Sequence, residues 1–153
     1  MALLVACSGT EGGARECGRR GARARGDPPL GADAEAGRGV ARPALPRAVV
    51  TLLPRDVARE LLAAHGLTDP ALVVGRSRDQ RPKPAPDGLL SACAALRVAP
   101  ASAVMIGDSS WDREAARAAG TAFVGVPTDP SGLPAGTVVC ADLAEAVRRA
   151  LAG

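Results

Sequence analysis

The sequence predicts an α/β fold in which a parallel sheet is covered by helices on both faces. Three observations predict it. From residue 48 onward, short apolar runs alternate with amphipathic stretches. The runs contain almost no polar residues, which is typical of strands that are buried on both faces. The stretches between the runs are long enough to form the helices that connect parallel strands.

Four runs are expected as strands, at residues 48–53, 71–75, 102–107 and 121–126, with a short fifth strand at 137–140. Helices are expected at residues 54–67, 85–98, 111–120 and 142–153. The first helix begins at Pro54, a residue favoured in a first turn, and closes at Gly66, a natural left-handed cap. This arrangement is Rossmann-like, with connections that are right-handed.

Helical periodicity predicts which side chains of the first two helices face the sheet. The inward positions expected are Val57, Leu61 and Leu62 in the first helix, and Leu89, Leu90, Cys93 and Leu96 in the second.

The chain divides into two unequal parts, a disordered or degenerate N-terminal segment at 1–47 and a core domain at 48–153. Between residues 11 and 47 the only aliphatic side chains larger than Ala are Leu30, Val40 and Leu45. So little apolar surface does not offset about 1–2 kcal/mol of backbone entropy per residue, so disorder is expected there.

Composition and charge argue against several classes of protein. Residues 1–47 hold 8 Arg and 5 acidic residues, whereas the rest holds 11 basic and 11 acidic residues, so no extended nucleic-acid face is expected in the core. No apolar run approaches the roughly 20 residues that span a bilayer. The four cysteines show no metal-binding spacing, which favours free thiols in the cytoplasm. The oligomeric state is not predicted.

Polar residues cluster where three of the expected strands end. Right-handed crossovers bring Thr51, the loop 76–85 and the stretch 107–112 to one edge of the sheet, where ligands bind in such folds. Asp108 and Asp112 are carboxylates one helical turn apart that suit Mg²⁺. Lys83, held between two prolines, is a positioned charge, and Thr51 offers a hydroxyl group. Together these groups fit a phosphate. Taken singly, Asp108 and Ser109 could instead cap a helix, Thr51 could be an ordinary strand residue, and Lys83 a solvated charge.

The ordered set "AVVTLLPRD", "RPKPAPDGLL" and "AVMIGDSSWD" resembles the haloacid dehalogenase superfamily, especially its phosphoglycolate-phosphatase-like members. The resemblance implies that Thr51 binds the transferring phosphoryl group, with Ser109 also at the substrate, and that Lys83 neutralises its charge. It implies that Asp108 binds Mg²⁺ and that Asp112 supports the metal or orients Lys83. Leu52 departs from the family, which commonly has Asn after the Thr.

The larger departure is the nucleophile. The superfamily attacks phosphorus with the first Asp of an N-terminal DxDGT motif, and the second Asp is the acid/base. Here "ALLVACSGT" fits the frame of that motif with Ala6 and Ser8 in place of both carboxylates, or it is a chance apolar start. Neither residue can do that chemistry.

The sequence therefore predicts a hydrolase derived from a Mg²⁺-dependent phosphatase of a small phosphorylated metabolite, weak or inactive as written. The alternative is a non-catalytic module that binds a phosphorylated metabolite or a partner chain. The chain is expected to be truncated, degenerate or the product of a shifted start or frame.

Overall fold

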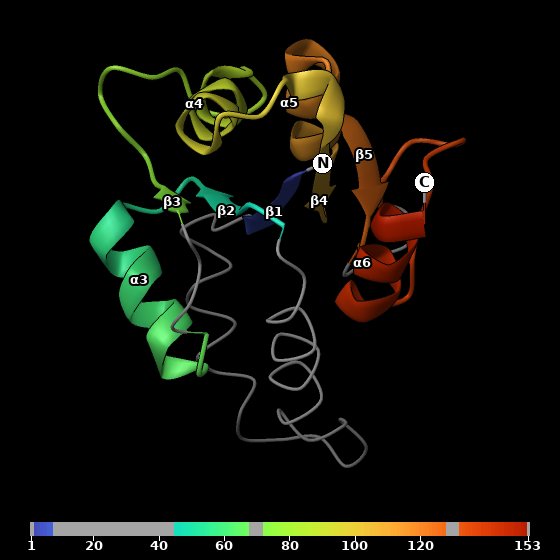
Figure 1. The fold of residues 1–153 in the computed structure, drawn as a ribbon, viewed down its shortest axis with the longest axis horizontal. Helices are drawn as coiled ribbons and strands as arrows, with labels where there is room; N and C mark the ends of the chain where they lie inside the picture. The colour runs from blue at the N-terminus through green and yellow to red at the C-terminus, as the bar shows by residue number, and fades with distance from the viewer. Residues whose placement is uncertain (1, 8–44, 68–71, 128–131, 153) are drawn as a thin grey trace.

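The structure is a computed structural model that describes residues 2–7, 45–67, 72–127 and 132–152. At its centre lies a parallel sheet in the order β3-β2-β1-β4-β5 (Figure 1). The strands are β1 (Ala2–Cys7), β2 (Arg47–Thr51), β3 (Leu72–Val74), β4 (Ala103–Gly107) and β5 (Ala122–Gly125). The four strands expected between residues 48 and 126 are all present, each within a few residues of its predicted bounds.

Helices cover both faces of this sheet, as the sequence predicts. They are α3 (Arg55–Ala64), α4 (Asp87–Leu96), α5 (Ser110–Ala119) and α6 (Leu143–Ala152), with a short 3₁₀ helix at Pro100–Ser102. Helices α4 and α5 lie together on one face, whereas α3 and α6 lie on the other (Figure 1). The Rossmann-like α/β fold is therefore confirmed.

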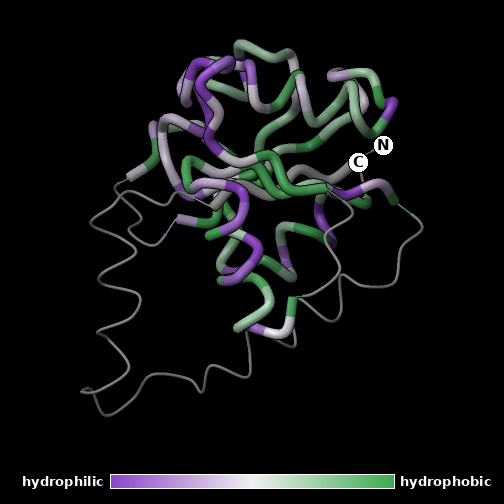
Figure 2. The backbone as a smooth tube through the Cα atoms, turned by 90° about the vertical axis from the view of Figure 1, so that its left-hand side faces the viewer, coloured by the Kyte–Doolittle hydropathy of each residue, from purple (hydrophilic) through white to green (hydrophobic). Residues whose placement is uncertain are grey.

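Strands β2 and β4 are buried on both sides because their apolar residues alternate between two layers. In β2, Val50 belongs to the cluster that includes residues of α4 and α5, while Val49 belongs to a separate cluster with α3. In β4, Met105 belongs to the first layer and Ile106 to a cluster with α6. Hydrophobic stretches accordingly run through the middle of the molecule (Figure 2).

Three of the predicted inward positions are wrong. Val57 and Leu61 of α3 are 42% and 43% exposed, and Leu90 of α4 is 41% exposed. Helix α3 packs at the edge of the sheet, so only a narrow stripe around Ala58 and Leu62 meets the strands. The sequence shows the apolar face of a helix, but not how far the sheet extends beneath it.

The other inward positions are confirmed, because Leu89 and Cys93 are buried and Leu96 packs against the same core. The short fifth strand is not formed. In that region the structure has only an isolated parallel bridge between Gly125 and Val139.

The N-terminal apolar run is a strand of the sheet rather than a chance apolar start. β1 pairs in parallel with β2 on one side and with β4 on the other, which makes it the central strand. Residues 2–7 of the predicted N-terminal segment thus belong to the sheet, whereas residues 8–44 lie outside the described residues, so their disorder stays a prediction. Within the described ranges, no helix is long and apolar enough to cross a membrane.

Candidate functional site

The carboxyl ends of the three central strands lie level with one another. Ala6 pairs with Val50, and Cys7 pairs with Thr51. On the other side of β1, Val5 pairs with Ile106, one residue before Gly107, where β4 ends. The backbone register therefore places the end of β1 between Thr51 and the loop that begins at Asp108.

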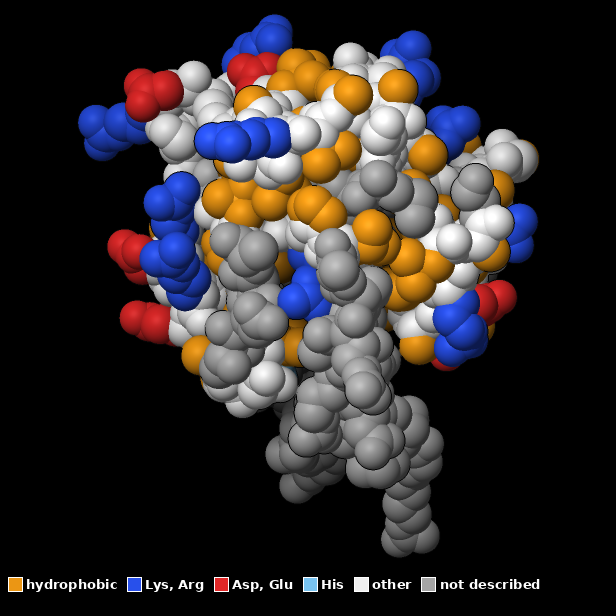
Figure 3. Space-filling model, in the orientation of Figure 1, with side chains coloured by type: hydrophobic (Ala, Val, Ile, Leu, Met, Phe, Trp, Pro, Cys, Tyr) orange, Lys and Arg blue, Asp and Glu red, His pale blue; other side chains and the backbone are white. Residues whose placement is uncertain are grey.

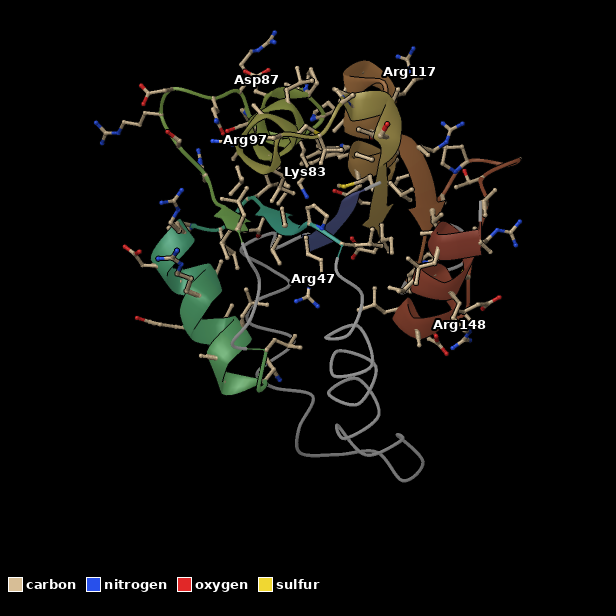
Figure 4. All side chains as sticks on the ribbon, in the orientation of Figure 1. Arg47, Lys83, Asp87, Arg97, Arg117 and Arg148 are labelled. Carbon is tan, nitrogen blue, oxygen red and sulfur yellow. The ribbon has the colours of Figure 1, made fainter. Side chains whose placement is uncertain are left out.

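Lys83 reaches into this edge and forms a buried ion pair. Its Nζ donates to Asp112 Oδ1 at 2.6 Å, and the two side chains are 5% and 0% exposed. Nζ also donates to the carbonyl oxygen of Val50 at 3.4 Å, next to Thr51. Figure 4 shows Lys83 between α4 and β2. Because burial removes water from both charges, each depends on the other for compensation.

Asp112 is held at its second oxygen by the start of α5. Its Oδ2 accepts from the Ser109 hydroxyl at 2.6 Å and from the Ser109 backbone N–H at 3.2 Å. The Asp112 N–H donates in return to Ser109 Oγ, which completes a capping box. The cap considered from the sequence is thus confirmed for Ser109. Of the two roles considered for Asp112, this geometry matches the orientation of Lys83. The role of Asp112 as a Mg²⁺ ligand stays a prediction. Both of its carboxylate oxygens already accept hydrogen bonds in this structure.

Gly107 lets the strand end approach Asp112 closely. A Cβ on Gly107 would lie 2.6 Å from the Cβ of Asp112 and 2.9 Å from its Oδ2, closer than side chains tolerate. The glycine in "GDS" therefore has a packing reason, since it makes room for the carboxylate that holds Lys83.

Thr51 is buried at the end of β2. Its Oγ1 accepts a hydrogen bond from the N–H of Leu53 at 3.2 Å, which leaves the hydroxyl proton available as a donor. Thr51 and Lys83 line the same pocket, about 30 Å³ in volume. The structure thus brings together two groups that lie far apart in the sequence and that both suit an anion.

Asp108 follows β4 directly, and its Oδ1 atom is buried. Within the described residues there is no group of three His, Cys, Asp or Glu side chains that could hold a metal ion. A single carboxylate suits Mg²⁺ only when phosphate oxygens and water complete the coordination shell. The donor set therefore fits a Mg²⁺ ion that binds together with a phosphorylated ligand.

A second ion pair, which the sequence did not predict, ties down the loop before α4. The Arg81 guanidinium donates to both oxygens of Asp87, with its shorter bond at 2.8 Å, and the Arg81 N–H donates to Oδ2. Hydrogen bonding from Arg81 lowers the pKa of Asp87, and the same bond raises the pKa of Arg81. Only the position of Asp87 at a helix start was visible in the sequence, because six-residue spacing in a loop does not indicate a contact.

The family of the chain follows from its sequence profile. The profile of the haloacid dehalogenase-like hydrolases matches residues 41–126, which is more than half of the chain. The chain belongs to this family. The match includes β2, the loop with Lys83 and the start of α5, so it contains the buried ion pair just described.

Individual relatives of this family are phosphatases. The chain is 36% identical over 104 residues to validoxylamine A 7'-phosphate phosphatase of Streptomyces hygroscopicus subsp. limoneus, an alignment that covers 66% of the chain and 49% of that protein. It is 48% identical over 75 residues to a plasmid-encoded phosphoglycolate phosphatase of Cupriavidus necator, over 48% of the chain and 32% of that enzyme.

Solved structures agree with this assignment. The crystal structure of a haloacid dehalogenase-superfamily hydrolase, subfamily IA, from Geobacter sulfurreducens matches 77% of the chain with a TM-score of 0.64 and 28% identity. The match covers 54% of that structure. The chain thus spans about half the length, or less, of the relatives it matches.

Proposed function

We propose that the chain derives from a Mg²⁺-dependent phosphatase of small phosphorylated metabolites and retains the phosphoryl-binding half of the site. One observation carries this proposal. The central strand ends in Ala6 and Cys7, level with Thr51 and next to the end of β4, where the family resemblance puts a nucleophilic aspartate. The binding groups are present around a position that has no carboxylate.

Thr51 and Lys83 are the groups that would bind the phosphoryl oxygens. The Thr51 hydroxyl has a proton to donate, and the Lys83 ammonium has three donors, of which two are used within the described residues. Asp112 positions Lys83, and the third N–H of the ammonium would be available to a phosphate oxygen. Ser109 would act mainly by holding Asp112 in place.

Asp108 would hold Mg²⁺ beside the phosphate. The ion would supply positive charge for the phosphate oxygens. Asp108 lies directly after β4, and Asp112 of α5 anchors Lys83. A phosphate between the Mg²⁺ ion at Asp108 and the Lys83 ammonium would therefore contact positive charge on two sides.

Without the nucleophile, turnover is expected to be slow. In the family, an aspartate carboxylate attacks phosphorus, the leaving alkoxide takes a proton from the second aspartate, and water then hydrolyses the aspartyl-phosphate. Ala6 cannot form the first bond and Ser8 has no group with a suitable pKa, so the remaining residues bind and polarise only. This favours a weak or inactive hydrolase.

The alternative is a module that binds a phosphorylated metabolite or a partner chain without catalysis. The buried ion pair between Lys83 and Asp112 favours a module that still binds phosphate. Its geometry is held by Ser109 and does not depend on the nucleophile. Nucleic acid is not the proposed partner. On the face that Figure 3 shows, Lys and Arg side chains lie at separate places around the outline and within the face rather than in one patch.

A cytoplasmic location is also proposed. Two cysteines of the core, Cys93 and Cys140, are buried free thiols, as expected in a reducing compartment. Burial raises the pKa of both thiols, which keeps them protonated and unreactive.

Restoring the two carboxylates tests the proposal. The variant Ala6→Asp/Ser8→Asp is compared with the chain itself and with Ala6→Asn/Ser8→Asn, which matches it in size but has no carboxylate. Hydrolysis of p-nitrophenyl phosphate with Mg²⁺ is expected to stay near the blank in the chain and to rise by about 10²-fold or more in the aspartate variant.

In that restored variant, Asp108→Asn should return the rate to the blank. Equal rates for the aspartate and asparagine variants would show that β1 does not stand in the position of the motif. A rapid, Mg²⁺-dependent rate in the unaltered chain would show that its chemistry does not need the missing carboxylates. Thermal stabilisation by phosphate with Mg²⁺, without turnover, would favour the binding module.

A further inference from the structure

The loop before α4 is closed on itself by Arg81 and Asp87. The Asp87 carboxylate accepts three hydrogen bonds from Arg81: from Nη2 at 2.8 Å, from the backbone N–H at 3.1 Å and from Nε at 3.2 Å. We call this contact the Arg81–Asp87 clamp. It joins the two ends of residues 81–87, and Lys83 lies between those ends.

The backbone inside the clamp has few conformations available. Its sequence is "PKPAP", in which each proline ring fixes its own φ and also restricts the residue before it. The N–H of Ala85 donates to the carbonyl oxygen of Pro82 at 3.0 Å, which closes a turn around Lys83. A short segment of this kind, tied at both ends, holds the direction in which the Lys83 side chain leaves the backbone.

Helix α4 sets the position of one end of the clamp. Asp87 is the first residue of α4. Gly88 lets this first turn lie close to β2, since a Cβ there would be 3.0 Å from the Cγ1 of Val50. Val50 is also the residue whose carbonyl oxygen accepts a hydrogen bond from Lys83 Nζ. The clamp therefore connects the loop to a helix turn that already packs against the strand that Lys83 must reach.

Lys83 needs this support because its long side chain must be buried. Its Nζ is held by Asp112, but that ion pair fixes only the tip of the side chain. A lysine side chain loses more rotamer entropy on ordering than most side chains do, in addition to the entropy of the backbone that carries it. By ordering the backbone, the clamp lowers the remaining entropy cost of bringing the ammonium group to the end of β2.

We infer that Arg81 and Asp87 are positioning residues for Lys83. Their clamp fixes the backbone of the loop so that the ammonium group stays beside Asp112 and the end of β2. The pair itself adds little to global stability, because the Arg81 side chain is 75% exposed and water screens its charge. The inference rests on the proposed function only for the use of Lys83 as a phosphate ligand. The position of Lys83 itself can be measured without a ligand.

Chemical modification tests the inference, because Lys83 is the single lysine of the sequence. Acetylation of Lys83 by acetic anhydride, followed by mass spectrometry of its peptide, should be slow in the unaltered chain, where the ammonium group is buried and paired. Arg81→Gln and Asp87→Asn should each accelerate it about two- to fivefold, since loss of an exposed ion pair makes local opening more frequent by about that factor. The free energy of unfolding in urea should change little.

Two further variants serve as controls. Arg78→Gln makes the same substitution in the same loop but outside residues 81–87, and it should leave the rate unchanged. Asp87→Glu keeps the carboxylate and should restore most of the protection that Asp87→Asn loses. Rates for Arg81→Gln and Asp87→Asn that equal the rate for Arg78→Gln would overturn the inference. So would an acceleration that merely follows a loss in the free energy of unfolding.

The proposed function is tested separately in the same assay. Inorganic phosphate with Mg²⁺ should slow the acetylation of Lys83 further, because a phosphate bound to the ammonium group shields it. Absence of this protection in the unaltered chain would overturn the proposed function, and the rates of the variants without phosphate would still decide the inference.

Discussion

The loop before α4 carries two ion pairs that differ mainly in burial. Arg81 and Lys83 are two residues apart, and each pairs with a carboxylate in the first turn of a helix, Asp87 of α4 and Asp112 of α5. The distances are similar, 2.8 and 2.6 Å. The Arg81 side chain, however, is 75% exposed, whereas the Lys83 side chain is 5% exposed.

The difference shows that spacing and charge in the sequence do not fix the energetic role of a pair. Water and salt screen the exposed pair, so it mainly restrains the loop. The buried pair has no water to replace a lost partner, so both charges are needed together. In Figure 4, Lys83 lies close to β2, whereas Asp87 lies at the outer side of α4.

Removal of Lys83 should have the largest effect. Lys83→Met keeps the length of the side chain but leaves the Asp112 carboxylate buried without its cation. We expect the free energy of unfolding, measured in urea, to be about 3–5 kcal/mol lower than that of the unaltered chain. That is a large part of the 5–15 kcal/mol typical of a domain.

A double variant sharpens this result. Lys83→Met/Asp112→Asn removes both charges and keeps an oxygen that can accept from Ser109. It should be more stable than Lys83→Met alone, because no uncompensated charge remains buried. A double variant that is less stable than either single variant would contradict the account of the buried pair.

Gly107→Ala should have an intermediate effect. The added methyl would lie 2.6 Å from the Cβ of Asp112, and the ion pair prevents that side chain from moving away. We expect a loss of about 1–3 kcal/mol of stability in urea unfolding. Gly88→Ala is the control, since its methyl would meet the Cγ1 of Val50 at 3.0 Å and the Cγ1 of Val74 at 3.9 Å, and it should change stability less. Equal losses would show that Asp112 is not tightly held.

Arg81→Gln should have the smallest effect, and that effect should depend on pH. Arg81 lowers the pKa of Asp87, so the pair stabilises the fold above the ordinary pKa of a carboxyl group and this contribution disappears as pH falls through the lowered value. The variant and the unaltered chain should differ slightly at neutral pH and converge in acid. NMR titration should show a higher pKa for Asp87 in the variant. An unchanged pKa would show that the exposed pair does not form in solution.

Much of the fold could be predicted from local patterns. Apolar runs give the strands, and Pro54 and Gly66 lie at the two ends of α3, with Gly66 at a φ of +72°. The exposure of Val57 and Leu61 could not be predicted, because it depends on where the sheet ends. Candidate residues Thr51, Lys83, Asp108, Ser109 and Asp112 were visible as polar residues at strand ends. The partners of Lys83 were not fixed by that pattern.

The sequence alone determined the alternation of strands and helices, because burial on both faces demands apolar runs of a recognisable length. It also determined that Ala6 and Ser8 carry no carboxylate, since that is residue chemistry. Only the tertiary structure decided that β1 is the central strand. It also decided that Lys83 pairs with Asp112, 29 positions away, whereas Arg81 pairs with Asp87. Such contacts form where the chain returns to one edge of the sheet, and their strength depends on the water that the surrounding atoms exclude.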